Sequence, residues 1–468
     1  MKMWSGRFRQ PLDPKFEQWQ RSFPFDQKLL LYELAASRAH AKALRTADVI
    51  SADEFNQILA ALQDLETRAA QQEAGFFDDP EAEDVHHFVE KKLVELIGET
   101  GKKLHSGRSR NEQIATDLRL FVRECTDQLL LSLGKFLDVI LRRAEENKTA
   151  VMPAYTHLQR AEPVLVTHWL LAYFQMFRRD AERLGDCRKR GNECPLGSGA
   201  IAGAPLALDR EIASRELGFD KPTANSMDAT SDRDFLIEFV NAVSLLGIHL
   251  SRWAEELILF ATQEYGFIKL PEAYSTGSSA MPQKQNPDSL ELIRGKSARL
   301  IGCQVALLTA LKGLPLAYNK DMQETQEPLL DAAATALTSV EIAEGFMRLV
   351  QFNTERMRQA CEAGFMNALA AATYLVKRDV PFRKAHEVVA HAVQLCLENN
   401  CQLEELTLEQ WRDLSPAFDA DIYEHLKLQV VLECHDVQGG TAPKQVQHAL
   451  RAAREQLAAF EEANVTHA

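Results

Sequence analysis

The stretch DLRLFVRECTDQLLLSLGKFLDVILRRAEENK, residues 117–148, has the apolar spacing of one long helix. Its apolar residues recur every three or four positions, and no proline interrupts them. At about 1.5 Å per residue, such a run forms a helix of roughly 45 Å. A helix of this length cannot be buried in a small globule, so the pattern predicts a bundle of helices that lie side by side.

Other stretches of the chain repeat this pattern. A second long apolar stripe covers Ser231–Thr262, a shorter one lies between Pro163 and Arg190, and two more follow Pro287 and Pro328. We find no alternation of strands and helices that would indicate a parallel sheet. The sequence therefore predicts a mostly α protein with a central long-helix bundle. The apolar faces are broad enough to predict a homo-oligomer built through these helices.

The composition excludes several classes of protein. The chain has 468 residues, and its 53 Lys and Arg against 67 Asp and Glu give a net charge of −14, which disfavours binding to nucleic acid or to an anionic membrane. Its most apolar stretch, Val164–Phe177, is too short to span a bilayer. The eight cysteines show no metal-binding spacing, and the N-terminus has no apolar signal core. These features predict a cytoplasmic protein with reduced thiols.

Four polar loops interrupt the helical runs, each at the end of a helix. They cover Gly101–Asn111, Met152–Pro163, Ser275–Glu291 and Leu314–Pro328. Loops on a rigid scaffold commonly carry binding and catalytic residues.

The loop STGSSAMPQKQNPDSLE, Ser275–Glu291, ends in a predicted helix start. Asn286 is a good N-cap and Pro287 suits the first helical position. The free N–H groups of that helix, together with Lys284, favour binding of a carboxylate. The alternative is an ordinary connector that leads into a capped helix.

Three short motifs resemble metal or nucleotide sites: two lack the context or spacing that such a site needs, and the third, HHFVE, has a usable i, i+4 spacing but a better explanation. HEVVAH, His386–His391, separates its two histidines by five positions, which places them on different sides of a helix. GSGAIAG, Gly197–Gly203, follows no predicted strand. HHFVE, His86–Glu90, is better explained as a solvated or site-adjacent helix face. We therefore expect no metal and no cofactor.

Longer motifs carry a family resemblance. GSSAMPQKQNP resembles the signature loop of the fumarase/aspartase superfamily. Other stretches resemble argininosuccinate lyase rather than fumarase or adenylosuccinate lyase: KKLHSGRSRNEQIATDL, MPAYTHLQRAEPV, SMDATSDRDF, LKGLPLAYNKDMQE, PFRKAHEVV and the N-terminal MWSGRF. The resemblance covers essentially the whole chain.

The resemblance implies a mostly α subunit of three domains. These are an N-terminal helical domain (1–112), a central long-helix bundle (113–363) and a small C-terminal helical domain (364–468). It implies a homotetramer in which loops from three subunits complete each active site. It also implies cleavage of argininosuccinate to arginine and fumarate, a step of arginine biosynthesis, without a cofactor.

The resemblance also assigns roles to individual residues. Ser278 matches the catalytic serine, His157 the catalytic histidine, Glu291 a carboxylate that pairs with this histidine, and Lys284 a cation beside the serine. We favour Ser278 as the base and His157 as the acid, although the sequence also permits the reverse. The substrate-binding candidates are Ser22, Asp26, Ser109, Arg110, Asn111, Thr156, Arg233, Thr276, Asn286, Tyr318, Gln323 and Gln326. Further candidates are Asp84, His86, Asp288 and Lys320.

The chain departs from the family pattern in the fourth loop. The family commonly has NKDxQEDKE, whereas this chain has NKDMQETQE, with Thr325 in place of an Asp and Gln326 in place of a Lys. That Lys helps to bind the carboxylate at the arginine end, so its loss predicts weaker binding of argininosuccinate. Two alternatives therefore stay open: a sister lyase that acts on another succinyl adduct, and a crystallin-like structural homologue without activity.

Overall fold

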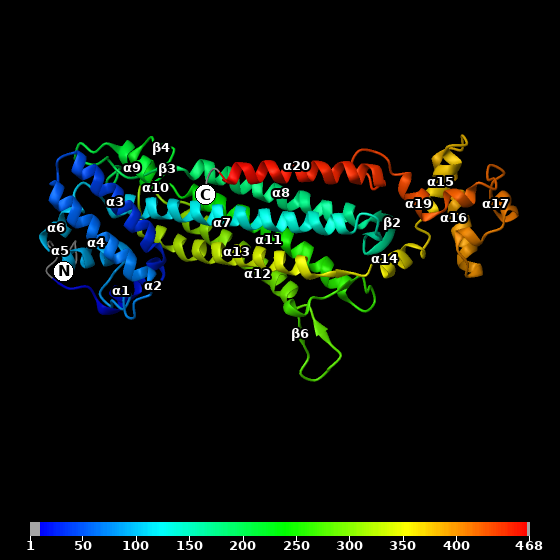
Figure 1. Ribbon diagram of the computed structural model, residues 1–468, viewed down its shortest axis with the longest axis horizontal. Helices are drawn as coiled ribbons and strands as arrows, with labels where there is room; N and C mark the ends of the chain where they lie inside the picture. The colour runs from blue at the N-terminus through cyan, green and yellow to red at the C-terminus, as the bar shows by residue number, and fades with distance from the viewer. Residues whose placement is uncertain (1–9, 466–468) are drawn as a thin grey trace. The chain divides into compact units, whose positions relative to one another are not determined.

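The computed structural model describes residues 10–465 of the chain, shown in Figure 1. The motif MWSGRF, Met3–Phe8, lies outside these residues. The first helices are α1 (Pro14–Trp19), α2 (Phe23–Asp26), η2 (Gln27–Leu29), α3 (Leu30–Thr46), α4 (Ala52–Ala70), α5 (Val85–Ile97) and α6 (Glu99–Lys103). The long helices are α7 (Arg110–Glu146), α8 (Val166–Gly191), α11 (Asp234–Ala261), α12 (Asp288–Leu311), α13 (Gln326–Leu349) and α20 (Pro443–Val465). The prediction of a mostly α fold with long helices is confirmed.

Shorter elements connect the long helices. The helical ones are α9 (Arg210–Glu216), α10 (Ser226–Ser231), η3 (Glu272–Tyr274), η4 (Lys320–Thr325), α14 (Thr354–Cys361), α15 (Ala368–Val376), α16 (Phe382–Asn399), η5 (Leu403–Glu405), α17 (Leu408–Leu414), α18 (Ile422–His425) and α19 (Leu428–Glu433). The strands are β1 (Val151–Thr156), β2 (Gln159–Leu165), β3 (Glu193–Cys194), β4 (Lys221–Pro222), β5 (Ile268–Lys269), β6 (Thr276–Gly277), β7 (Gln285–Asn286) and β8 (Gln351–Phe352). The pairs β1–β2, β5–β8 and β6–β7 are antiparallel, and β3–β4 is parallel.

The chain divides into two compact units. Among the described residues, unit 1 takes 10–128, 182–245 and 299–336, and unit 2 takes 129–181, 246–298 and 337–465. Several long helices, α7 among them, contribute residues to both units. The three-domain boundaries stay a prediction.

Unit 1 is held together by small and apolar side chains of α3, α7 and α9. Ala36 and Ala39 of α3 are buried against Leu120 of α7 and against Leu217 and Phe219, which follow α9. Alanines on the inner face of α3 let the neighbouring elements approach closely. This packing fixes α3 and the start of α7, which carry residues of the candidate site described below.

Unit 2 is a bundle whose core is aromatic. Trp253 of α11 is 1% exposed and makes edge-to-face contacts with Phe136 of α7 and Phe346 of α13, at ring-centroid distances of 5.6 and 5.8 Å. Phe177 of α8 lies 4.9 Å from the same Phe136 ring. These residues belong to the apolar stripes that predicted the helices, so the stripes are the surfaces that meet.

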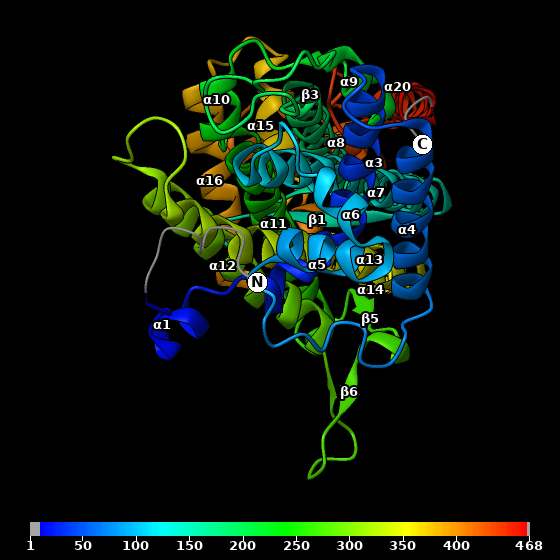
Figure 2. The same ribbon diagram turned by 90° about the vertical axis from the view of Figure 1, so that its left-hand side faces the viewer.

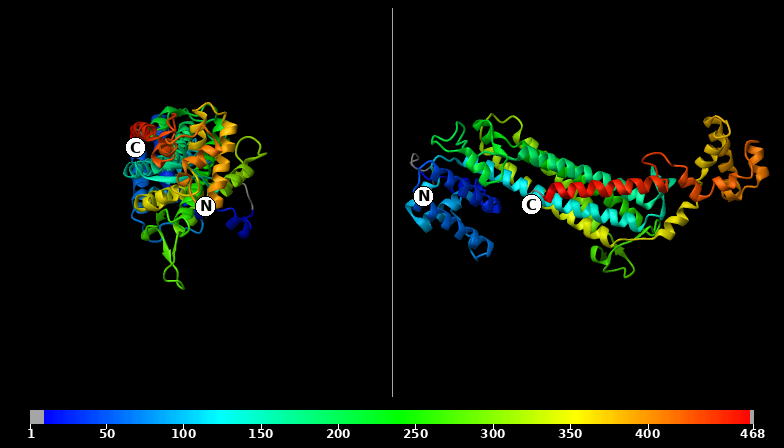
Figure 3. Two further views of the ribbon diagram at one scale, coloured as in Figure 1. Left: turned by 90° about the vertical axis from the view of Figure 1, so that its right-hand side faces the viewer. Right: turned by 45° about the horizontal axis from the view of Figure 1, so that its top comes forward.

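Helix α20 lies along this bundle, as Figure 3 shows. Arg454 of α20 bonds to Asp138 at 2.6 Å and to Glu145 at 2.8 Å, both on α7. Gly134 of α7 leaves room for Phe460, because an added Cβ would lie 3.3 Å from that ring. A separate core formed by α15–α18 surrounds the fully buried Trp411.

Helix α11 is the helix within residues 10–465 that is long and apolar enough to cross a membrane. In its most apolar window, 56% of the helix is buried inside the protein.

Candidate active site

Unit 1 contains a polar cavity of about 140 Å³, which we call the acidic cavity. Its lining residues come from the region of α2, the start of α5, the start of α7 and the segment around η4. They are Ser22, Asp26, Glu83, Asp84, His86, Arg110, Asn111, Ile114, Tyr318, Lys320, Gln323 and Gln326. The fold thus brings together substrate-binding candidates from three distant parts of the sequence. Glu83 and Ile114 were not among the predicted residues.

Asp26 is a buried carboxylate in this cavity. It is 1% exposed, and it accepts hydrogen bonds from the Ser22 hydroxyl at 2.6 Å and from the Val85 N–H at 3.0 Å. It forms no ion pair with any residue in the range 10–465. Burial, and then the nearby charge of Asp84, raise the pKa of Asp26 to about 7. The described residues therefore leave this carboxyl group without an ion-pair partner, and the nearby charge of His86 offsets only part of the rise in its pKa.

The cations that line the acidic cavity are already paired. Arg110 lies 3.1 Å from Asp84 and 3.5 Å from Glu83, and Lys320 lies 3.8 Å from Glu83. Asp84 is also the N-cap of α5, where it accepts from the His87 N–H at 2.7 Å. Burial opposes ionisation of Asp84, but Arg110, His86 and the His87 N–H together outweigh burial and lower the pKa of this carboxyl.

Two glutamines lie on the segment around η4. The Gln323 side-chain amide donates to the Gln20 carbonyl at 3.1 Å. Gln326 begins α13 and is 5% exposed, and its Oε1 has no hydrogen-bond partner in the described part of the chain. Thr325, the other departure from the family pattern, is fully buried and donates to the Met322 carbonyl at 2.7 Å. The Gln326 Oε1 atom is thus a buried acceptor without a donor among the described residues.

Arg233 lies close to Tyr318 but does not line the acidic cavity. It is 2% exposed and donates to the Asp232 carbonyl at 2.7 Å. Burial lowers its pKa to about 10, and its Nε has no partner among the described residues. Burial also raises the pKa of the Tyr318 hydroxyl.

A buried charge network lies next to His86. This histidine of α5 bonds to Glu33 of α3 at 2.9 Å and lies 3.7 Å from Asp117 of α7. Burial would lower the pKa of His86, but Glu33 and Asp117 raise it to about 9. Burial would raise the pKa of Glu33, but Arg108 and His86 lower this pKa to about 2. Burial and Glu33 raise the pKa of Asp117.

The sequence reasoning missed Glu33 and Asp117. Both are carboxylates within strongly apolar helical runs, a signal that can be interpreted only when their partners on other helices are known. Their ligand atoms and that of His86 lie within 4.8 Å of one another, which is a spacing that a metal ion requires. Arg108, 3.7 Å from Glu33, already offsets part of the negative charge, so we interpret the group as a charge network. His86 is buried, and it belongs to the site rather than to a solvated helix face.

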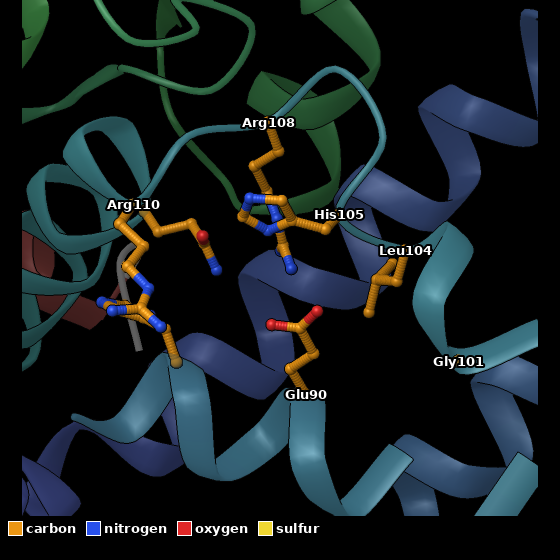
Figure 4. Close-up of a pocket in the computed structure, with 8 residues that line it drawn as sticks. Glu90, Gly101, Leu104, His105, Arg108 and Arg110 are labelled. Carbon is orange, nitrogen blue, oxygen red and sulfur yellow. The ribbon is translucent and has the colours of Figure 1, made fainter. Parts of the chain in front are cut away.

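A second, much smaller cavity shares Arg110 and His86 with the acidic cavity. Figure 4 shows Glu90 of α5 pointing toward His105 and Arg108 on the loop before α7. Arg108 donates to the Ser37 hydroxyl at 2.9 Å. Ser109 ends this loop and caps α7, since its Oγ accepts from the Asn111 N–H at 3.3 Å and its own N–H donates to Glu112 at 3.0 Å.

His157 lies at the tip of the β1–β2 hairpin in unit 2. Thr156 pairs with Gln159, so His157 and Leu158 form the turn between the strands. Both have positive φ, 55° and 57°, as in a type I′ turn. This conformation is unfavourable for a leucine, and both side chains are exposed. The hairpin thus presents His157 and Thr156 to solvent on a strained tip.

Ser278 lies in the loop between β6 and β7, which Figures 1 and 2 show projecting from the helices. Its Oγ accepts from the N–H groups of Ala280, at 3.3 Å, and of Met281, at 3.1 Å. Lys284 is exposed in the same loop. These contacts place two backbone donors on the oxygen that we expect to carry negative charge.

The start of α12 differs by one or two residues from the prediction. Asn286 belongs to β7 and pairs with Thr276, and α12 begins at Asp288. The Thr276 hydroxyl donates to the Asp288 carboxylate, which ties the hairpin to the first turn of the helix. The strand pairing therefore takes Asn286 out of the cap position that the sequence suggested.

The catalytic candidates His157, Ser278 and Glu291 form no hydrogen bond or ion pair with one another within residues 10–465. Between the His157 hairpin and the Ser278 hairpin, no hydrogen bond or ion pair is formed by the described residues, and His157 does not pair with Glu291 there. Glu291 is exposed in the first turn of α12. Both hairpins belong to unit 2, whereas the acidic cavity belongs to unit 1.

Comparison with known proteins identifies the family. A lyase family model matches residues 6–302, and a model of the argininosuccinate lyase C-terminal region matches residues 365–433. With the long-helix fold, these matches define a carbon–nitrogen lyase of the fumarase/aspartase superfamily. The argininosuccinate lyase of Koribacter versatilis is 57% identical over 462 residues, 99% of each chain, and that of Acidobacterium capsulatum is 57% identical over 97% of this chain and 94% of its own. The chain belongs to the argininosuccinate lyase family.

A solved structure of EDDS lyase in complex with formate has the same fold. It superposes with a TM-score of 0.87 over 98% of this chain and 92% of its own, at 26% identity.

Proposed function

We propose that the protein cleaves argininosuccinate to L-arginine and fumarate by β-elimination. The observation that carries this proposal is the acidic cavity. It gathers Ser22, Tyr318 and Gln323, to which the family resemblance assigns binding of substrate, around the buried carboxyl group of Asp26, which forms no ion pair with a cation of the described residues. The arginine end of the substrate carries such a cation, its α-ammonium group.

The chemistry requires a base, an acid and stabilisation of negative charge. A proton leaves the carbon next to a carboxylate, and the guanidino nitrogen departs from the neighbouring carbon. The intermediate is an aci-carboxylate dianion, so donors must face the carboxylate before the reaction begins. Lys284 and the N–H groups of its loop supply such donors.

Ser278 is the proposed base. A serine hydroxyl is a weak base in water, and it acts as one only where its alkoxide is stabilised. The two N–H groups that already point at its Oγ, together with Lys284, favour this ionised form. Closure of the projecting hairpin over substrate excludes water and strengthens these interactions. His157 is the proposed acid that protonates the leaving nitrogen.

The working form is proposed to be a homotetramer whose subunits share their active sites. Helix α12 supports this, because it leaves Leu292, Ile301, Val305 and Leu308 exposed in the single chain. Such a row of apolar side chains is typical of a helix that packs against another subunit. No hydrogen bond or ion pair joins His157 to Ser278 in the described part of a single chain, which agrees with sites completed by neighbouring subunits. Sedimentation at micromolar concentration tests this proposal, and a monomer there contradicts it.

We infer a cytoplasmic location. All eight cysteines are free thiols, and three of the buried ones, Cys194, Cys361 and Cys396, are widely separated in sequence. Free thiols are usual in a reducing compartment.

The activity is tested by fumarate release. The purified protein is mixed separately with argininosuccinate, adenylosuccinate, aspartate and malate, and fumarate is followed by ultraviolet absorbance. The proposal predicts fumarate with stoichiometric arginine from the first substrate alone. Turnover of another substrate instead identifies a sister lyase, and no turnover by a folded oligomer favours the crystallin-like alternative.

A further inference from the structure

The acidic cavity contains a buried carboxyl group without an ion-pair partner and a buried amide oxygen without a hydrogen-bond donor among the described residues. They are the carboxyl group of Asp26 and the Oε1 atom of Gln326. Both side chains are more than nine-tenths buried. A buried charge without a counter-charge and a buried acceptor without a donor are both costly, so the cavity favours a ligand group that brings N–H donors and a positive charge. A primary ammonium group has both properties.

The cations that line the same cavity are already paired with protein carboxylates. Among them, His86 bonds to Glu33 at 2.9 Å through Nδ1, and its Nε2 has no hydrogen-bond partner among the described residues. Arg110 is committed to Asp84 and Glu83, and Lys320 lies next to Glu83. Arg233 is not a lining residue. A ligand carboxylate in this cavity would have to compete with protein carboxylates for these cations, and it would find Gln326 as a neutral partner. The ammonium group of an α-amino acid should therefore contribute more to binding in this cavity than its carboxylate.

We infer that this enzyme recognises the leaving guanidino compound by its ammonium group, and that it accepts compounds in which the α-carboxylate is absent. The substrate class is N-succinyl adducts of guanidino amines, with or without a carboxylate next to the amine. This inference rests on the proposed function, because it uses the same reaction and the same cavity.

The reverse reaction gives a direct test. A guanidino nitrogen adds to one carbon of the fumarate double bond, a C–N bond forms, and the nitrogen loses one proton. The electron pair of the double bond takes up one proton at the other carbon. The addition is balanced without an oxidant or reductant, and it consumes the fumarate absorbance.

The experiment compares three partners for fumarate with the full-length protein. Arginine has both groups, agmatine keeps the ammonium and lacks the carboxylate, and 5-guanidinopentanoic acid keeps the carboxylate and lacks the ammonium. We expect kcat/KM for agmatine to lie within about tenfold of that for arginine. The value for 5-guanidinopentanoic acid should fall by about a hundredfold or more, because Asp26 then stays without its cation.

The outcomes separate this inference from the proposed function. If arginine itself gives no addition, the proposed function is wrong. If arginine reacts but agmatine is as poor as the deaminated acid, or poorer, the enzyme is an argininosuccinate lyase and the inference alone is overturned. These comparisons need only the natural protein, so they do not depend on the folding of a variant.

A charge substitution sharpens the test. Gln326→Lys supplies a cation for the carboxylate, so the preference for arginine over agmatine should rise by about tenfold or more. Gln394→Lys makes the same change at an exposed position of α16 and should leave the preference as it is. An unchanged preference in Gln326→Lys contradicts the assignment of Gln326 to this end of the ligand.

Discussion

Replacing Asp26 by Asn should stabilise the protein at neutral and alkaline pH. The carboxyl group has a pKa of about 7 in the folded protein against an ordinary value of 3.8, with burial as the main cause. An acid with a raised folded pKa keeps its proton in the folded state after the unfolded chain has lost it. Stability therefore falls as the pH rises from about 4 to about 7, and it then stays level.

The size of the effect follows from the shift. At roughly 1.4 kcal/mol for each pH unit, ionisation of Asp26 costs up to about 4 kcal/mol of unfolding free energy above pH 7. Asparagine avoids this cost and fits the same contacts, because its oxygen can accept from the Val85 N–H and its amide can donate to the Ser22 oxygen. Between pH 5 and pH 8 the variant should gain about 3 kcal/mol relative to the natural protein.

The assay is urea unfolding at pH 5 and pH 8, at one protein concentration because oligomers unfold in a concentration-dependent way. Asp413→Asn, an exposed change of the same kind, is the control and should show no such gain. A difference between Asp26→Asn and the natural protein that is equal at both pH values, or larger at pH 5, refutes the reasoning. Binding of substrate should weaken in Asp26→Asn, since the cation loses its charged partner.

Three further changes test the catalytic loop, the departure from the family pattern and the core. Ser278→Ala should lower kcat by several orders of magnitude and leave the circular dichroism spectrum unchanged; turnover near the natural rate would exclude Ser278 as the base. Gln326→Lys should lower KM for argininosuccinate roughly tenfold, because a charge-assisted contact replaces a neutral one, and steady-state kinetics measures this. Trp253→Ala should cost about 3–5 kcal/mol of unfolding free energy, because it opens a cavity between Phe136 and Phe346; denaturant titration showing a loss below about 1 kcal/mol would contradict the packing described for this core.

The site was predictable where the sequence carries local motifs. Ser278 and His157 lie in loops that the sequence marks by glycine, proline and polar residues, and Asp26, Arg110 and Tyr318 were found through the family resemblance. Neither a local motif nor the family resemblance identified Glu83. It lines the cavity only because the fold positions the segment before α5 there. Glu33 and Asp117 were missed because a carboxylate in an apolar helix has meaning only when its partners on other helices are known.

The sequence by itself determined the helices and the family. Apolar side chains at a spacing of three or four residues indicate a helix and the face that it buries, because this spacing is a local property of the sequence. The tertiary structure decided which charges meet. It placed the buried Asp26 beside Ser22 and Val85, paired Arg110 with Asp84, and left Gln326 without a donor. These results depend on distances between elements far apart in the chain, because pKa values and ion pairs are set by neighbours in space rather than by neighbours in sequence.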